Sequence, residues 1–162
     1  MCSQSAFRFG DYVANYALFP TSKLQKDLAN DYITENADSE QHSAWLREYV
    51  QEHNAEFDFK VQLVRNLVEH SVKNCTVEWD EEKYPFETVA RVFLLKGQDA
   101  FDAQRRVFWE DQMKLNPWYG IDARKALGSV NLRKTLFQRS VARRNELNGC
   151  RADVIRNIGQ IP

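Results

Sequence analysis

The stretch LGSVNLRKTLFQRSVARRN, residues 127–145, has helical spacing and concentrates positive charge around one aromatic residue, Phe137. At about 100° per residue its cationic side chains spread around a helix and form no single stripe. Binding to nucleic acid would need stacking aromatics or groove-reading residues beside them, and no such motif is present. We therefore interpret the charges as a solvated helix face with some salt bridges, although a surface for an acidic partner stays open. The cations are Arg133, Lys134, Arg139, Arg143 and Arg144.

Carboxylates gather in the run VEWDEEKYPFE, residues 77–87. They could serve acid–base chemistry or hold a hard cation, but they lie beside turn-favouring residues and lack the pattern of an EF-hand loop. A charged surface loop is the favoured interpretation. The acids are Glu78, Asp80, Glu81, Glu82 and Glu87.

Histidines and cysteines are scattered along the chain and form no cluster with metal-ligand spacing. A histidine acting as ligand or base needs partners, which sequence proximity does not supply here. We expect His42, His53 and His70 to be surface or satisfied structural residues, and Cys2, Cys75 and Cys150 to be reduced thiols. No nucleophile elbow, phosphate-binding glycine loop or HExxH helix occurs, so we assign no catalytic residue and no metal ligand.

The composition indicates one folded domain. The 162 residues are 43% hydrophobic and carry a formal net charge of -1, which excludes a global field favouring nucleic acid or an anionic membrane. No apolar run approaches the roughly 20 residues of a membrane span, and the N-terminus lacks the pattern of a leader peptide. We expect a cytoplasmic protein with neither nucleic acid nor membrane as partner.

Hydrophobic periodicity predicts an α+β fold. Strands are predicted over 7–20, over AEFDFKVQLV at 55–64, and over ETVARVFLLKG at 87–97, the last of them buried. Between the last two, 65–86 is predicted to be mostly loop, with an extended piece at 76–79.

Helices are predicted in three further places. Ser22 and Gln25 have capping-box spacing for a short helix, and a second helix is expected over 39–53. Asp99 is predicted to cap a helix that ends at Pro117. The stretch from Ser129 to Asn148 completes a helical C-terminal third, with Gly149 as the stop.

Four stretches, taken in order, resemble the catalase-like haem proteins, in particular the small catalase-like domains of bacteria and fungi. They are SQSAFRFGDYVANYALFP at 3–20, FKVQLVRN at 59–66, VKNCTVEWDEEKYPFETVARV at 72–92 and LNPWYGIDARKALGSVNLRK at 115–134. The resemblance implies a partial antiparallel β-barrel, in which the predicted strands are the later strands of the family's barrel. It further implies that 1–162 is a single domain resembling the C-terminal part of a catalase-like domain, and that 127–145 is the helix beside the haem.

The same resemblance places cofactor-binding positions on that helix. Arg133 falls on the family's proximal arginine, and Phe137 falls on the tyrosine whose phenolate binds haem iron. A phenyl ring has no lone pair to give iron, so Phe137 cannot replace that ligand. The family's distal histidine and asparagine have no counterpart either, because the chain enters the family pattern only at SQSAFRFGDY. Haem is implied by the family, yet no cofactor is expected in this chain alone.

Three functions stay open. An incomplete barrel would leave a sheet edge beside an apolar face, which favours a truncated, haem-free interaction or structural module that forms a homo-oligomer or docks on a complementary chain. The second is a haem-dependent peroxidase or hydroperoxide-converting oxidoreductase, with this chain as part of a split domain. The third is a haem-free protein that binds or isomerises an apolar small molecule. Its pocket would be lined by Phe57, Phe59, Trp109, Trp118 and Phe137.

Overall fold

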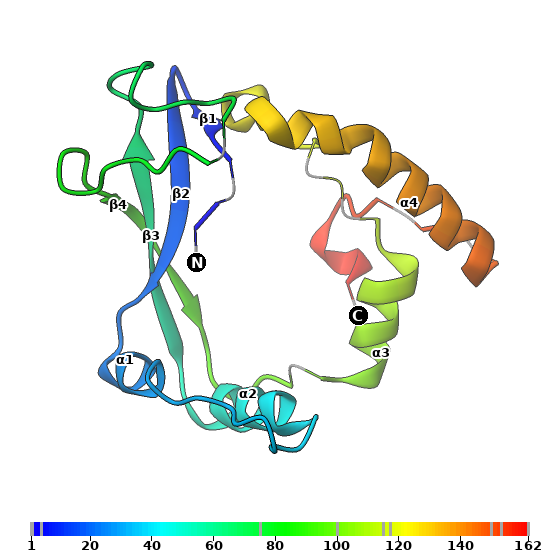
Figure 1. Ribbon diagram of the computed structural model, residues 1–162. Helices are drawn as coiled ribbons and strands as arrows, with labels where there is room; N and C mark the ends of the chain where they lie inside the picture. Colours follow the sequence, from blue (N-terminus) through cyan, green and yellow to red (C-terminus); the bar gives the residue numbers. More distant parts are fainter. Residues whose placement is uncertain are drawn as a thin grey trace. The chain divides into compact units, whose positions relative to one another are not determined.

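A computed structural model describes residues 2–3, 5–74, 76–99, 101–114, 116, 118–149, 151–152 and 154–161 (Figure 1). Strands and helices are interspersed along the chain, and the C-terminal third is helical, so the predicted α+β class is confirmed. The strands are β1 (Phe7–Phe9), β2 (Tyr12–Pro20), β3 (Ala55–Leu63) and β4 (Glu87–Leu94). The α-helices are α1 (Lys23–Leu28), α2 (Gln41–Glu52), α3 (Ala103–Val107) and α4 (Arg133–Asn148). A π-helical turn η1 (Phe108–Gln112) and the 3-10 turns η2 (Asp122–Arg124), η3 (Gly128–Leu132) and η4 (Ile158–Gln160) complete the order.

The four strands form one antiparallel sheet in the order β1-β2-β3-β4. This sheet is open: within the described residues its outer strands do not pair, so the prediction of a partial barrel is not supported. The predicted single strand over 7–20 was also wrong. Gly10, at φ +64°, turns the chain between Phe9 and Tyr12, which face each other in a two-residue hairpin. Glycine suits this place because the first central residue of such a turn takes a positive φ.

The predicted burial of the last strand was wrong. β4 pairs antiparallel with β3, with Phe57 opposite Val92, yet all eight residues of β4 are exposed. A run of β-branched and apolar residues indicates a strand, but burial on both faces needs a covering layer. In the part of the chain that is described, β4 lies at the edge of the sheet.

One compact unit comprises residues 17–61 and 87–102. Its helix α1 starts as predicted, because the Ser22 hydroxyl accepts a hydrogen bond from the Gln25 backbone N–H at 3.2 Å. The Gln25 side chain departs from a capping box, since its Oε1 accepts from the Glu56 backbone N–H at 3.0 Å and so ties α1 to β3. Helix α2 lies within the predicted 39–53.

The second compact unit comprises residues 2–16, 62–86 and 103–162. Its loop 65–86 is irregular as predicted, but no strand forms at 76–79. Gly128, at φ +62°, lies against the Val72 carbonyl oxygen so closely that a Cβ would collide with it. The buried apolar side chains of this unit are Ala6, Ala14, Trp79, Met113, Ala126, Val141 and Ala152.

The helical C-terminal third departs from the prediction at its helix starts. Asp99 accepts a hydrogen bond from the Phe101 backbone N–H at 2.9 Å, but α3 begins only at Ala103 and continues as the π-helical turn. Its predicted end at Leu115 and Pro117 lies outside the described residues. The last helix forms as expected after a 3-10 start, and Gly149 ends it at φ +64°.

Candidate functional site

The predicted cofactor positions lie on the first two turns of α4. Arg133 is its first residue and is exposed, whereas Phe137 is half-buried one turn later. The Phe137 ring meets Trp118 edge to face, with 5.8 Å between ring centroids. Trp118 is held in turn, because its indole N–H donates to Asn131 Oδ1 at 3.0 Å.

A cavity of about 280 Å³ opens beside Phe137. It is lined by Trp109, Met113, Phe137, Ser140, Val141 and Arg144. Phe137 and Trp109 therefore share a cavity as the small-molecule hypothesis expects, and Trp118 contacts Phe137. Phe57 and Phe59 belong to β3 in the other unit and do not line it. Arg133 does not line it either.

Arg144, which the sequence analysis placed on a solvated helix face, instead contacts another element. Its guanidinium donates to the carbonyls of Met113 at 2.7 Å and Glu110 at 3.1 Å, at the end of η1. Asn148, one turn later on α4, donates to the Asp111 carboxylate at 3.1 Å. These bonds give hydrogen-bond partners to carbonyls at the end of η1, and they hold η1 against α4. The two elements form two walls of the cavity.

The chemistry of this cavity does not fit haem iron. The described residues of its lining include no histidine, cysteine, tyrosine or carboxylate, and the donors they offer iron are the Met113 thioether and the neutral Ser140 hydroxyl. Among the described residues, no group of three or more His, Cys, Asp or Glu side chains is placed to hold a metal. The lining is mostly apolar, so a small apolar guest is the ligand it suits.

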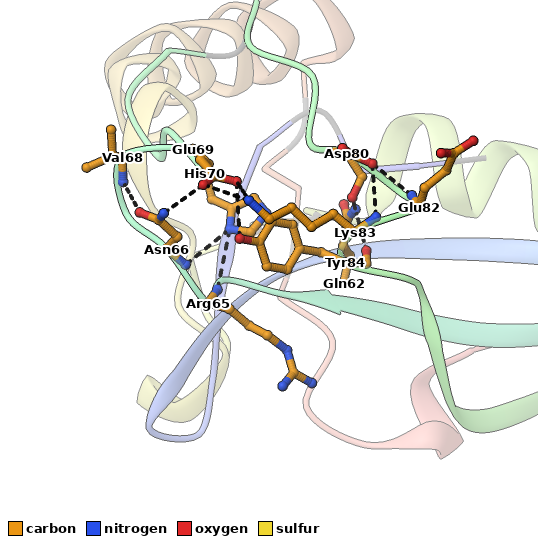
Figure 2. Close-up of polar contacts among 10 residues, drawn as sticks. All are labelled: Gln62, Arg65, Asn66, Val68, Glu69, His70, Asp80, Glu82, Lys83 and Tyr84. Carbon is orange, nitrogen blue, oxygen red and sulfur yellow. Dashed lines mark hydrogen bonds and ion pairs between the residues drawn. The ribbon is translucent and has the colours of Figure 1, made fainter.

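A second cluster, around His70, was not predicted from the sequence (Figure 2). His70 is 1% exposed, and its ring centroid lies 4.2 Å from that of Tyr84 and 4.8 Å from that of Trp79. Its Nδ1 accepts from the backbone N–H groups of Arg65 at 3.3 Å and Asn66 at 3.4 Å. Two accepted hydrogen bonds at Nδ1 place the proton of a neutral imidazole on Nε2.

Burial is the main cause that lowers the pKa of His70 below its ordinary 6.5, and the nearby Glu69 carboxylate partly opposes this. Glu69 itself binds the Lys83 ammonium at 2.7 Å and accepts from the Tyr84 hydroxyl at 3.1 Å (Figure 2). The Lys83 hydrogen bond lowers the pKa of Glu69 in turn. At 1% exposure His70 is buried as a structural histidine would be, but its Nε2 has no hydrogen-bond partner among the described residues, so the expected satisfied ring is found only in part.

Gln62 holds the other end of this loop. Its side chain is 2% exposed, and its amide donates to the Tyr84 carbonyl at 2.9 Å (Figure 2). The same amide donates to the Trp79 carbonyl at 3.3 Å. The acidic run is thus a structured surface loop, in which Asp80 also accepts from the Glu82 backbone N–H at 2.9 Å. No sequence motif marks such an arrangement, because Gln62 and Tyr84 are 22 residues apart and His70 lies between them without a fixed spacing to either.

Comparison with known proteins gives this site no family context: no protein-family model, no curated protein and no solved structure matches the chain. Within the described residues, none of the helices combines the length and the apolar character that a bilayer crossing requires.

Proposed function

We propose that this chain is a haem-free interaction module that pairs with a second copy of itself along strand β4. The observation that carries this proposal is the exposure of an apolar edge strand. Val89 is 44% exposed, Phe93 56% and Leu94 45%, and Leu95, just beyond the strand, is 66% exposed. The backbone groups on the outer side of an edge strand template the addition of another strand, and apolar side chains favour it.

A second copy suits this edge because β4 can pair antiparallel with itself. In such a pair, a two-fold axis places identical residues opposite each other. With Val92 on the axis, Ala90 faces Leu94, and Phe93 faces Arg91, whose guanidinium is paired with Asp58 on β3 at 3.1 Å. An axis at Arg91 would instead place the two guanidinium groups opposite each other, in place of an apolar pair at the centre.

The β-bulge in the β3–β4 pairing limits the length of this contact. Between Phe59 and Lys60 the partner on β4 moves from Ala90 to Thr88, so Val89 is the extra residue. Bulges twist an edge away from a new strand. The segment free to pair regularly is therefore 90–94, centred on Val92.

The resemblance to catalase-like haem proteins belongs to this proposal as well. In that interpretation β2, β3 and β4 correspond to later strands of the family's barrel. A complete barrel would pair the outer edge of β4 with another strand, and here a second copy of the chain supplies that strand. The chemistry around Phe137, which offers iron no phenolate, supports a haem-free module. The haem-dependent and small-molecule alternatives stay predictions.

Sedimentation velocity over a range of protein concentrations tests the pairing. The unmodified chain is expected to sediment as a dimer, and Val92→Lys as a monomer, because a lysine on the axis opposes its own copy and keeps an edge solvated. Leu67→Lys is the matched control: Leu67 is 74% exposed in the loop of the other unit and should leave the dimer intact. Far-UV circular dichroism verifies that both variants fold. A monomeric unmodified chain, or a dimer that persists in folded Val92→Lys, contradicts the proposal.

A further inference from the structure

A groove of about 490 Å³ lies along α2, in the unit formed by residues 17–61 and 87–102. Helix α1 contributes Leu24 and Leu28 to its lining, and α2 contributes Trp45, Leu46 and Tyr49. On α2 these positions share one face of the helix, as residues three and four apart do. The groove is therefore an amphipathic helix face that α1 covers only in part.

The apolar side chains of this groove are open to a ligand. Leu24, Leu28, Trp45 and Leu46 are each between 40% and 44% exposed. Leucine and tryptophan side chains on the apolar stripe of a helix are ordinarily covered, and covering them is favourable because apolar surface leaves water. Tyr49 is fixed at the same face, because its hydroxyl donates to the Asn54 carbonyl at 3.2 Å.

The charge of the lining has one sign. Asp31, Glu48 and Glu52 contribute carboxylates, while the described residues that line the groove include no lysine or arginine. His42 and His53 complete the lining, and the Glu52 carboxylate lies 4.0 Å from His53 Nε2. Carboxylates beside an apolar wall favour a cation over an anion, and the faces of Trp45 and Tyr49 add a cation–π attraction.

We propose that this groove binds a small organic cation, an amine that carries an apolar chain or ring. The amine would lie among Asp31, Glu48 and Glu52, and the apolar part would lie against Leu24, Leu28 and Leu46. A volume of about 490 Å³ is within the range of pockets for small organic ligands, roughly 300–1,000 Å³. A carboxylate of the same chain length would be repelled, so the proposed site selects by charge and by apolar length together.

An NMR titration with butylammonium, hexylammonium and octylammonium tests whether the groove selects ligands by apolar chain length, and uncharged and anionic analogues test whether it selects them by charge. Backbone resonances of α1 and α2 are expected to shift, and the affinity should rise by about fourfold for each added methylene group that is buried. Octanoate and octanol separate charge from apolar length: octanol should bind more weakly than octylammonium, and octanoate should not bind. Octanoate binding as tightly as octylammonium, or no shift with any of the amines, overturns the proposal.

Matched variants locate the effect. Glu48→Gln with Glu52→Gln should weaken octylammonium binding by about tenfold, since two of the three lining carboxylates lose their charge. Glu35→Gln with Glu40→Gln removes the same charge from residues that do not line the groove and should change the affinity less than twofold. Equal effects of the two pairs would mean general charge attraction and overturn the site. Shifts of α1 and α2 resonances on dilution of folded Val92→Lys, in which the β4 pair is expected to be absent, would also overturn it, because a second copy would then occupy the groove.

Discussion

The imidazole of His70 is kept neutral by its surroundings. Burial lowers its pKa, and the adjacent Lys83 ammonium acts in the same direction, whereas Glu69 opposes both. Nothing in the spacing of the three histidines distinguished His70 from His42 and His53. The difference arises because Trp79 and Tyr84 pack against one ring and exclude water from it, which is a tertiary effect.

The free energy of unfolding should depend on pH through His70. When the pKa of a histidine is lower in the folded than in the unfolded state, its contribution to stability is fully present at pH values above the unfolded-state pKa, which is about 6.5. This contribution should fall as the pH drops from there toward the lowered folded-state pKa, because the unfolded chain then binds the proton more readily. Urea unfolding between pH 7.5 and pH 5 measures the slope.

His70→Asn removes the titration while an amide oxygen can still accept the two backbone hydrogen bonds. Its free energy of unfolding should vary less with pH across this window than that of the unmodified chain. His42→Asn and His53→Asn should retain the full dependence. If either of these flattens the curve and His70→Asn does not, the assignment to His70 is wrong.

Within α4, similar basic residues have different roles. Arg143 pairs with Glu146 one turn later at 2.7 Å, with both side chains largely exposed, as expected for a solvated helix face. Arg144 lies on the side of α4 that faces η1, and it donates to the carbonyls of Glu110 and Met113 at the end of that turn. Helical spacing places the two side chains about 100° apart, but it does not say which of them meets another element.

Arg144→Met should destabilise the protein more than Arg143→Met. Methionine retains most of the apolar stem but leaves the carbonyls of Glu110 and Met113 without their donor, at a cost of about 1–3 kcal/mol. Loss of the exposed Arg143 pair should cost no more than about 0.5 kcal/mol. Urea unfolding at one pH compares the variants. Equal losses would mean that Arg144 does not hold η1 to α4.

At the scale of the whole chain, haem binding is the property that the family resemblance implies and that the chemistry of the Phe137 cavity opposes. Added haemin should show the absorbance of free haemin and no sharpened, shifted Soret band, because an iron ion near Phe137 finds no anionic ligand. Phe137→Tyr supplies a phenol at that position. A Soret shift seen in this variant alone would support the resemblance, whereas a stoichiometric shift in the unmodified chain would contradict a haem-free module.

Local signals in the sequence were sufficient for the α+β class, the start of α1 at Ser22, the strand at β3 and the C-terminal helix with its stop at Gly149. Each depends on residues within one turn or one strand, where hydrogen bonding and periodicity act over a short range. The hairpin at Gly10 was within reach of the same reasoning, since a glycine and an aspartate between two apolar runs is a turn signal.

Only the tertiary structure decided what covers each element. The apolar pattern of β4 is the same for a buried strand and for an exposed edge, so its exposure depends on which neighbours the chain supplies. The burial of His70 and the contact of Arg144 with η1 likewise join residues distant in sequence. Contacts of this kind follow from how the whole chain packs, and no single segment of the sequence encodes them by itself.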